Sequence, residues 1–123
     1  MRFGAGMRVE NNQVIVSVDG DLDLATVPRV RSLLHTELDL GRARFVVDLT
    51  DCTFIDSSGF GLLIGGRRRA RDAGGGLEIV VSDPGLRRVF RASEMDRIFG
   101  LHESVPEASE HLEAELLGGK HAS

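Results

Sequence analysis

The stretch FIDSSGFGLLIGGRRRARDAGGG, residues 54–76, carries the chain from a strand into a helix. A strand-like run ends at Asp56, and either Ser57 or Ser58 begins a helix, since Asp and Ser both favour a helix N-terminus. Three glycines at 74–76 supply the left-handed turn that ends it. The apolar residues with helical spacing, which we expect to face the core, are Phe60, Leu63 and Ile64.

The segment before this stretch changes from strand to helix periodicity. MRVENNQVIVSVDG (7–20) predicts two strands joined at Asn11-Asn12, because Asn tolerates the positive φ of a tight hairpin. In the second strand, Val14, Val16 and Val18 lie on one side and Ile15 on the other. A helix follows, from Thr26 to a stop near Gly41. Its expected inner stripe is Val27, Val30, Leu34 and Leu38.

The whole chain reads as ββαβαβαβα. The remaining predicted elements are a strand at 44–50, a strand at 77–82, a helix at 82–93 with Leu86, Val89 and Phe90 inside, a short strand around 98–101 and a helix at 105–117. Alternating strands and helices in 123 residues predict one α/β domain. We expect a mixed, mostly parallel sheet of about five strands flanked by about four helices. The predicted domain is 1–117, with a flexible tail at 118–123.

The composition of the chain excludes several classes of function. A net charge of −4 argues against nucleic acid as a partner, and the arginines at 67, 68, 69 and 71 suit a solvated helix face. The single cysteine, Cys52, is expected to be a small buried residue.

The four histidines have no metal-site spacing, so no metal is predicted. With no signal peptide and no apolar run of membrane-spanning length, we expect a cytoplasmic protein that does not bind membranes.

Polar residues follow two of the predicted strands. Asp21 and Asp23 follow one strand, and Asp56, Ser57 and Ser58 follow another; if these strands are close in the sheet, the side chains form one polar rim. These polar residues could serve four purposes: a helix cap, a serine nucleophile, a phosphate-binding loop or a serine that is modified. No G-x-S-x-G or P-loop pattern supports the second or third. A phosphoserine at a helix N-terminus is compatible with the fold and can block an interface, which favours a binding switch.

The segment FVVDLTDCTFIDSSGFGLLIGGRRRARDAGGGLEIV closely resembles the signature of STAS domains, in particular single-domain bacterial anti-sigma factor antagonists. The resemblance extends through VDGDLDLATVPRVRSLL upstream and SDPGLRRVFRASEMDRIF downstream, so it covers nearly the whole chain. It implies a sheet flanked by helices. One departure is Ser93-Glu94-Met95, where relatives commonly have Ser-Gly-Leu, which puts the geometry of that turn in question.

The resemblance also implies a function. Such proteins bind an anti-sigma factor that is itself a serine kinase, and so release the sigma factor. The kinase inactivates the antagonist by phosphorylating the serine after the motif aspartate, here Ser57, and a serine phosphatase reverses the modification. ATP and metal belong to these partners, so this chain is expected to be neither an enzyme nor a cofactor-binding protein. The partner surface carried over by position comprises Asp23, Asp56, Ser58, Gly59 and Leu62. An alternative is a scaffold of a stressosome-like assembly.

Overall fold

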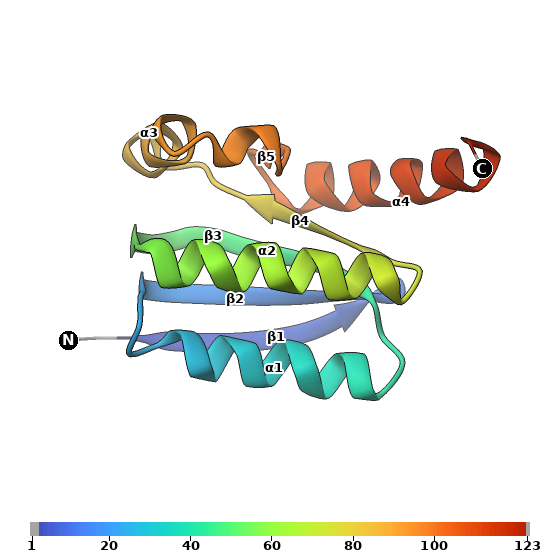
Figure 1. The fold of residues 1–123 in the computed structure, drawn as a ribbon, viewed down its shortest axis with the longest axis horizontal. Helices are drawn as coiled ribbons and strands as arrows, with labels where there is room; N and C mark the ends of the chain where they lie inside the picture. Colours follow the sequence, from blue (N-terminus) through green and yellow to red (C-terminus); the bar gives the residue numbers. More distant parts are fainter. Residues whose placement is uncertain (1–2, 123) are drawn as a thin grey trace.

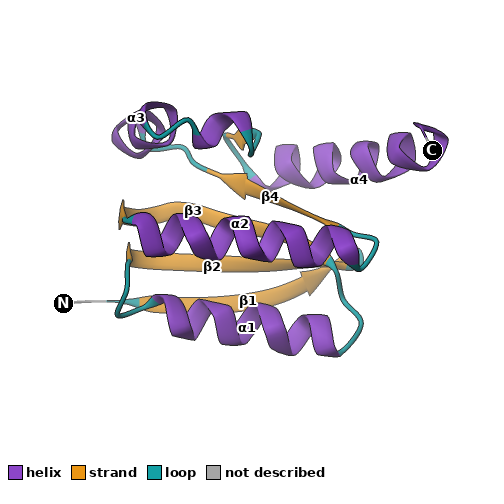
Figure 2. Cartoon of the chain, viewed as in Figure 1, coloured by secondary structure: helices purple, strands orange, loops and turns teal. Residues whose placement is uncertain are grey.

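The computed structural model describes residues 3–122, except for the side chains of 119–122. A five-stranded sheet is flanked by helices, which confirms the predicted fold class (Figures 1 and 2). The strands are β1 (Gly4–Glu10), β2 (Gln13–Leu22), β3 (Arg44–Ile55), β4 (Gly76–Val80) and β5 (Leu101–His102). The helices are α1 (Val27–Asp39), α2 (Ser57–Asp72), α3 (Pro84–Ala92), the 3₁₀ turn η1 (Met95–Arg97) and α4 (Val105–Ala122).

The predicted hairpin forms at Asn11-Asn12. Asn11 and Asn12 have φ values of 50° and 63°, the left-handed pair that a two-residue hairpin turn requires. β1 and β2 therefore pair in antiparallel register, with Glu10 opposite Gln13.

The strand order is β1-β2-β3-β4-β5, and every pair after the first is parallel. The carboxyl ends of the neighbouring strands β2 and β3 therefore meet, with Leu22 paired to Ile55. The register shifts twice along this pair, next to Gly20, whose φ is +103°. Such bulges redirect the strand, in this case just before the loops that leave the sheet.

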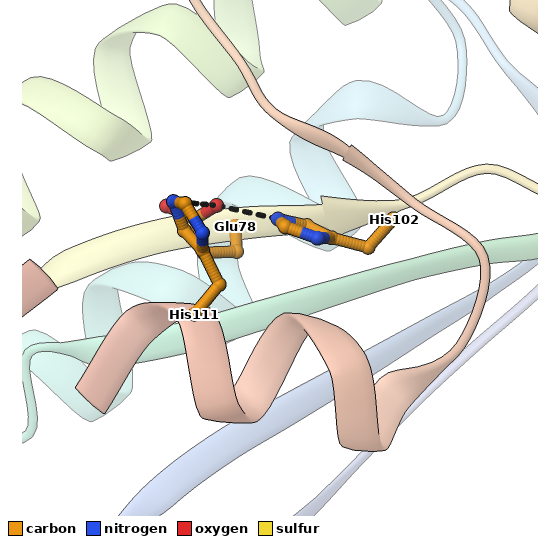
Figure 3. A group of neighbouring side chains, drawn as sticks. All are labelled: Glu78, His102 and His111. Carbon is orange, nitrogen blue, oxygen red and sulfur yellow. Dashed lines mark hydrogen bonds and ion pairs between the residues drawn. The ribbon is translucent and has the colours of Figure 1, made fainter. Parts of the chain in front are cut away.

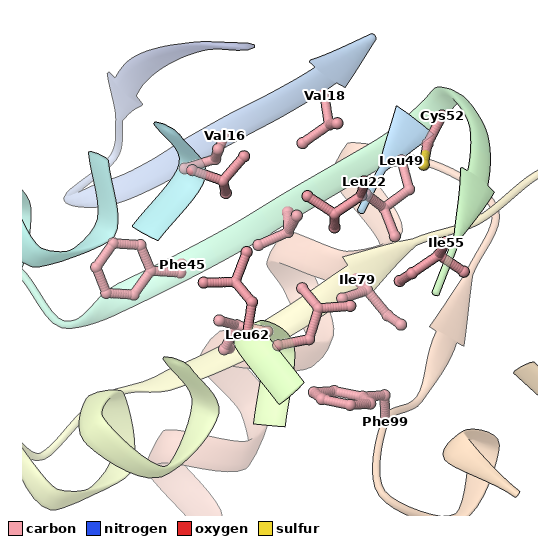
Figure 4. Close-up of a cluster of buried hydrophobic side chains, with 14 of the residues drawn as sticks. Val16, Val18, Leu22, Phe45, Leu49, Cys52, Ile55, Leu62, Ile79 and Phe99 are labelled. Carbon is pink, nitrogen blue, oxygen red and sulfur yellow. The ribbon is translucent and has the colours of Figure 1, made fainter. Parts of the chain in front are cut away.

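The sheet has two buried faces. On one face Val14, Val16 and Val18 pack in the core cluster shared with α1 and α2, part of which is drawn in Figure 4. On the other, Ile15 packs with Ala108 and Leu112 of α4. The predicted alternation along β2 is thus confirmed, because successive strand residues point to opposite faces.

Three local expectations were wrong. The predicted strand at 44–50 and the strand-like run before Asp56 are one strand, β3, because its polar second half still places Cys52 and Ile55 in the core. Val89 is 42% exposed, since the short helix α3 buries only Leu86 and Phe90. The final strand is the two-residue β5, later than predicted, because Ile98 and Phe99 lie in the turn after η1, where their N–H groups donate to the Met95 carbonyl.

The turn after α3 keeps a glycine-like geometry without glycine. Glu94 has φ 61° and ψ 18°, a left-handed conformation that L-residues adopt at a cost. The departure at Ser93-Glu94-Met95 is therefore accommodated by backbone strain at one residue.

Helix α4 runs to Ala122 and so enters the segment predicted as a tail, 118–123. Ser123 and the side chains from 119 onward lie outside the described residues, and the flexibility of this segment stays a prediction. Among the described helices, none combines the length and apolarity needed to cross a membrane.

Candidate functional site at the start of helix α2

Asp56 makes the transition from β3 to α2. Its backbone is extended (φ −110°, ψ −173°), and its Oδ1 accepts a hydrogen bond from the Gly59 N–H at 3.0 Å. This is the N-cap geometry that satisfies an otherwise unpaired amide of the first turn. Of the two helix starts that the sequence left open, the structure has the one at Ser57, and Asp56 is the cap.

The same aspartate connects α2 to the loop after β2. Its Oδ2 accepts a hydrogen bond from the Leu24 N–H at 3.3 Å, and its own N–H donates to the Leu22 carbonyl at 3.3 Å. Three residues before Asp56, near the end of β3, the Thr53 hydroxyl donates to Oδ1 of Asp21 in β2 at 2.8 Å. The polar residues that follow β2 and β3 therefore do form one rim, as the sequence predicted.

Asp23 stabilises the loop that leads into α1. Its Oδ1 accepts hydrogen bonds from the N–H groups of Ala25 (3.0 Å) and Thr26 (3.2 Å), the turn that Asp side chains commonly form with the backbone that follows. Thr26 occupies the N-cap position but makes no side-chain cap; its hydroxyl donates to the Asp21 carbonyl at 2.7 Å. Asp23 is half-buried, so part of its carboxylate still faces solvent.

The two serines differ in accessibility. Ser57, the first residue of α2, is exposed, whereas Ser58 is half-buried. In the described part of the chain, neither hydroxyl has a hydrogen bond to a histidine, the group that would activate a serine nucleophile. An incoming protein can reach Ser57 without any change of the backbone.

Two residues predicted to contact a partner lie inside the protein instead. Gly59 is buried, and a Cβ there would be 2.6 Å from both the Leu22 carbonyl oxygen and Ile55 Cγ1. Leu62 is 5% exposed and belongs to the core cluster, which also contains Leu34 of α1. Their placement is a correction: both hold the helix in position and offer no side chain to a docking partner.

Two apolar residues that the sequence reading missed border the rim. Leu24 is 75% exposed in the loop after β2, and Phe54 is 51% exposed near the end of β3. The Asp56–Leu24 hydrogen bond and the pairing of Phe54 with Asp21 bring both residues to the same end of the sheet as Ser57. The sequence does contain a hint of Leu24: it is an apolar residue in DLDLAT, before the helix and outside the helical spacing of the residues that α1 turns toward the core.

Cys52 lies under this rim as an inert core residue. It is 3% exposed, and its Sγ donates to the Phe54 carbonyl at 3.3 Å. Burial raises the pKa of the Cys52 thiol, which keeps it protonated and unreactive. The expectation of a small buried cysteine is confirmed.

The arginines of α2 lie far from Ser57. Arg69 and Arg71 are in the last turn of the helix, and the 12 residue steps from Ser57 to Arg69 correspond to about 18 Å along the axis. Cations at this end are favoured by the helix dipole. They therefore do not contribute directly to the rim around Ser57.

A model of the STAS domain matches residues 6–108. The chain belongs to the STAS domain family. An anti-sigma F factor antagonist of Paenibacillus polymyxa is 26% identical to this STAS domain over 114 residues, which cover 92% of this chain and 97% of the relative.

Solved structures agree with the fold. A putative anti-sigma factor antagonist from Thermotoga maritima has a TM-score of 0.81 at 21% identity, covering 89% of this STAS domain and 94% of that chain. The Bacillus cell fate determinant SpoIIAA in its phosphorylated form has a TM-score of 0.66 at 24% identity, and the match covers 89% of this STAS domain and 98% of that chain.

Proposed function

We propose that this STAS domain is an anti-sigma factor antagonist switched by phosphorylation of Ser57. In the unphosphorylated form it binds an anti-sigma factor that is a serine kinase, and the sigma factor is released. The observation that carries the proposal is the setting of Ser57: an exposed hydroxyl at a capped helix start, bordered by the exposed side chains of Leu24 and Phe54. The relatives named as anti-sigma factor antagonists, and the solved phosphorylated form of SpoIIAA, support it.

The fold tolerates a phosphate at this position. A phosphoserine carries about −1.5 to −2 charges, and a helix N-terminus favours an anion by roughly 0.3–1 kcal/mol. The carboxylate of Asp56 opposes this gain, but Ser57 is exposed, so solvent screens the repulsion. The net effect on folding is therefore small in either direction.

A docked partner does not tolerate the same phosphate. The rim already contains Asp21, Asp23 and Asp56, so the unmodified surface suits a partner with complementary positive or hydrogen-bond-donating groups. Burying an additional dianion without a matched cation costs several kcal/mol. About 3 kcal/mol corresponds to a roughly hundredfold loss of affinity. Phosphorylation thus switches binding while the domain stays folded.

Ser57 acts in this proposal as a substrate and not as a nucleophile. The kinase partner supplies ATP and its metal, a serine phosphatase removes the phosphate, and this domain performs no catalysis of its own. Both reactions and the release of the sigma factor take place in the cytoplasm, which is where we place the protein.

The test is site-specific phosphorylation by the serine-kinase anti-sigma factors encoded in the same genome. Trypsin yields a single peptide, residues 45–67, that contains both serines and also Thr50 and Thr53, because no Lys or Arg lies between Arg44 and Arg67. Fragmentation of this peptide assigns the phosphate to one hydroxyl. We expect Ser57 to be modified, Ser57→Ala to be unmodified, and Ser58→Ala to be modified as in the wild type. Phosphate on Ser58 in the wild type, or equal modification of Ser57→Ala, contradicts the assignment.

A further inference from the structure

Three ionisable side chains meet on the face of the sheet that α4 covers. Glu78 comes from β4, His102 from β5 and His111 from α4 (Figure 3). His102 Nε2 lies 2.7 Å from Glu78 Oε1, and His111 Nε2 lies 3.7 Å from the same oxygen. Glu78 and His102 are each 6% exposed. One donor atom from each of the three residues falls within 4.8 Å of the others.

We propose that Glu78, His102 and His111, with Glu115 as a fourth ligand, bind one divalent transition-metal ion of the Zn²⁺ class. Glu115 follows His111 by one helical turn, and its Oε2 lies 3.5 Å from His111 Nε2. Glu115 lies outside the three-residue cluster, and its side chain, 53% exposed, must turn toward the cluster to complete a set of two imidazoles and two carboxylates. This site is separate from the proposed phosphorylation site, because α1 and α2 pack on the other face of the sheet.

The distances are close to those of a tetrahedral site. Zn–N and Zn–O bonds of about 2.0–2.2 Å place neighbouring donor atoms roughly 3.3–3.5 Å apart. The 3.5 Å and 3.7 Å separations already fall near this value, and the 2.7 Å hydrogen bond must lengthen. The side chains of His111 and Glu115 are 49% and 53% exposed, so they can adjust without disturbing the core.

The donor types select the metal. Imidazole nitrogens suit Zn²⁺, Co²⁺, Ni²⁺ and Cu²⁺, whereas Mg²⁺ and Ca²⁺ prefer sites made of oxygen alone. Glu78 Oε1 and Glu115 Oε2 both lie beside His111 Nε2, at 3.7 Å and 3.5 Å, so two carboxylates face the same imidazole nitrogen. A bound cation would relieve the repulsion between Glu78 and Glu115.

The surroundings of His102 resemble a metal site in two further respects. Its second ring nitrogen, Nδ1, lies 3.4 Å from Glu107 Oε1, the carboxylate contact that commonly orients a metal-binding histidine. Residue 100 is glycine, and a Cβ there would lie 3.2 Å from His102 Nε2 and 3.5 Å from Glu78 Oε1. The space beside the two buried donor atoms is therefore free of any side chain from that position.

A route from solvent exists. The ligands His111 and Glu115 are about half exposed, so an ion can reach the cluster past these two side chains. Glu78 and Glu115 also line a surface hollow between the end of α2 and α4, but Arg44, Arg67 and Arg71 line it too, so the hollow itself is not the entry path for a cation.

The alternative is that Glu78 and His102 form only a structural pair, which would need neither His111 nor Glu115. The test uses the full untagged chain after chelator treatment, titrated with Zn²⁺ by calorimetry and with Co²⁺ by visible absorption. We expect one ion per chain and the intense ligand-field bands of four-coordinate Co²⁺. Magnesium in large excess should not displace the ion.

The variants His111→Gln and Glu115→Gln remove ligands that are half exposed, so they should leave the fold intact by circular dichroism. We expect His111→Gln to weaken Zn²⁺ binding by about tenfold or more, and Glu115→Gln to change the Co²⁺ spectrum. His35→Gln, on α1, is the matched control and should bind as the wild type does. The proposal is overturned by wild-type binding that is absent or not one to one, by His111→Gln binding as tightly as the wild type, or by a loss caused by His35→Gln.

Discussion

The carboxylate of Asp56 accepts a hydrogen bond from the Leu24 N–H at 3.3 Å while its other oxygen caps α2 through Gly59 at 3.0 Å. One side chain therefore fixes the start of the helix and also ties it to the loop after β2. Because Ser57 is the next residue, its position relative to Leu24 depends on this carboxylate. Asp56 therefore positions the proposed phosphorylation site.

Replacing Asp56 tests that positioning. Asp56→Ala removes the cap and the link to Leu24, and we expect it to lower the free energy of unfolding by about 1–2 kcal/mol. Asp56→Asn keeps an oxygen acceptor and should lose less than about half of that. Urea denaturation followed by circular dichroism measures both. Equal losses in the two variants would contradict the cap as the source of the effect.

Two glycines of α2 form a matched pair. A Cβ at Gly59 meets the Leu22 carbonyl and Ile55 at 2.6 Å, whereas a Cβ at Gly61 has no atom within 4 Å. Gly59→Ala should therefore destabilise the domain by about 1–3 kcal/mol. Gly61→Ala should stabilise it by up to about 1 kcal/mol, since Ala is the better helix former. Thermal unfolding compares them, and a shift of the same sign in both variants would contradict the packing at Gly59.

Leu24 and Phe54 are expected to contribute affinity for the kinase partner. Leu24→Ser and Phe54→Ser change exposed side chains, so stability should change by no more than about 0.5 kcal/mol. Affinity should fall by about tenfold or more if the residues are buried in the interface. Leu40→Ser is the control: Leu40 is 63% exposed but lies just after α1, at the opposite end of that helix from Leu24. An equal loss of affinity in Leu40→Ser would remove the case for a localised surface.

Glu94 has a left-handed backbone conformation at a position where the family resemblance implies glycine. Glu94→Gly should raise the free energy of unfolding by about 0.5–1 kcal/mol, because glycine adopts φ 61° without steric cost. The ion pair with Arg97 at 3.3 Å is largely exposed and contributes little. Glu94→Ala loses this pair without relieving the strain, so it should give no gain. A gain of equal size in Glu94→Ala would show that the backbone is not its source.

The sequence predicted the parts of the fold that local patterns determine. The alternation of Val14, Ile15 and Val16 identified both faces of β2, and Asn11-Asn12 identified the hairpin. The rim was also predictable, because the carboxyl ends of neighbouring parallel strands meet at one edge of the sheet.

Features that depend on packing between distant elements were missed. Leu62 was predicted to contact a partner, but it lies in the core cluster together with residues of α1, and no local pattern specifies that packing. The cluster of Glu78, His102 and His111 could not be predicted from the sequence either. Its members come from three elements, and only the fold brings their donor atoms within 4.8 Å of one another. Spacing rules detect metal ligands that share one helix or loop, and these residues share neither.

The central claim is that a phosphate on Ser57 abolishes partner binding and leaves the domain folded. The most direct measurement compares the affinity of the phosphorylated and unphosphorylated chains for the anti-sigma factor kinase, with a denaturation curve of each form. We predict a loss of affinity of about a hundredfold and a change in unfolding free energy of less than about 1 kcal/mol. Equal affinity of the two forms, or a phosphorylated chain that has lost its folded structure, would contradict the account.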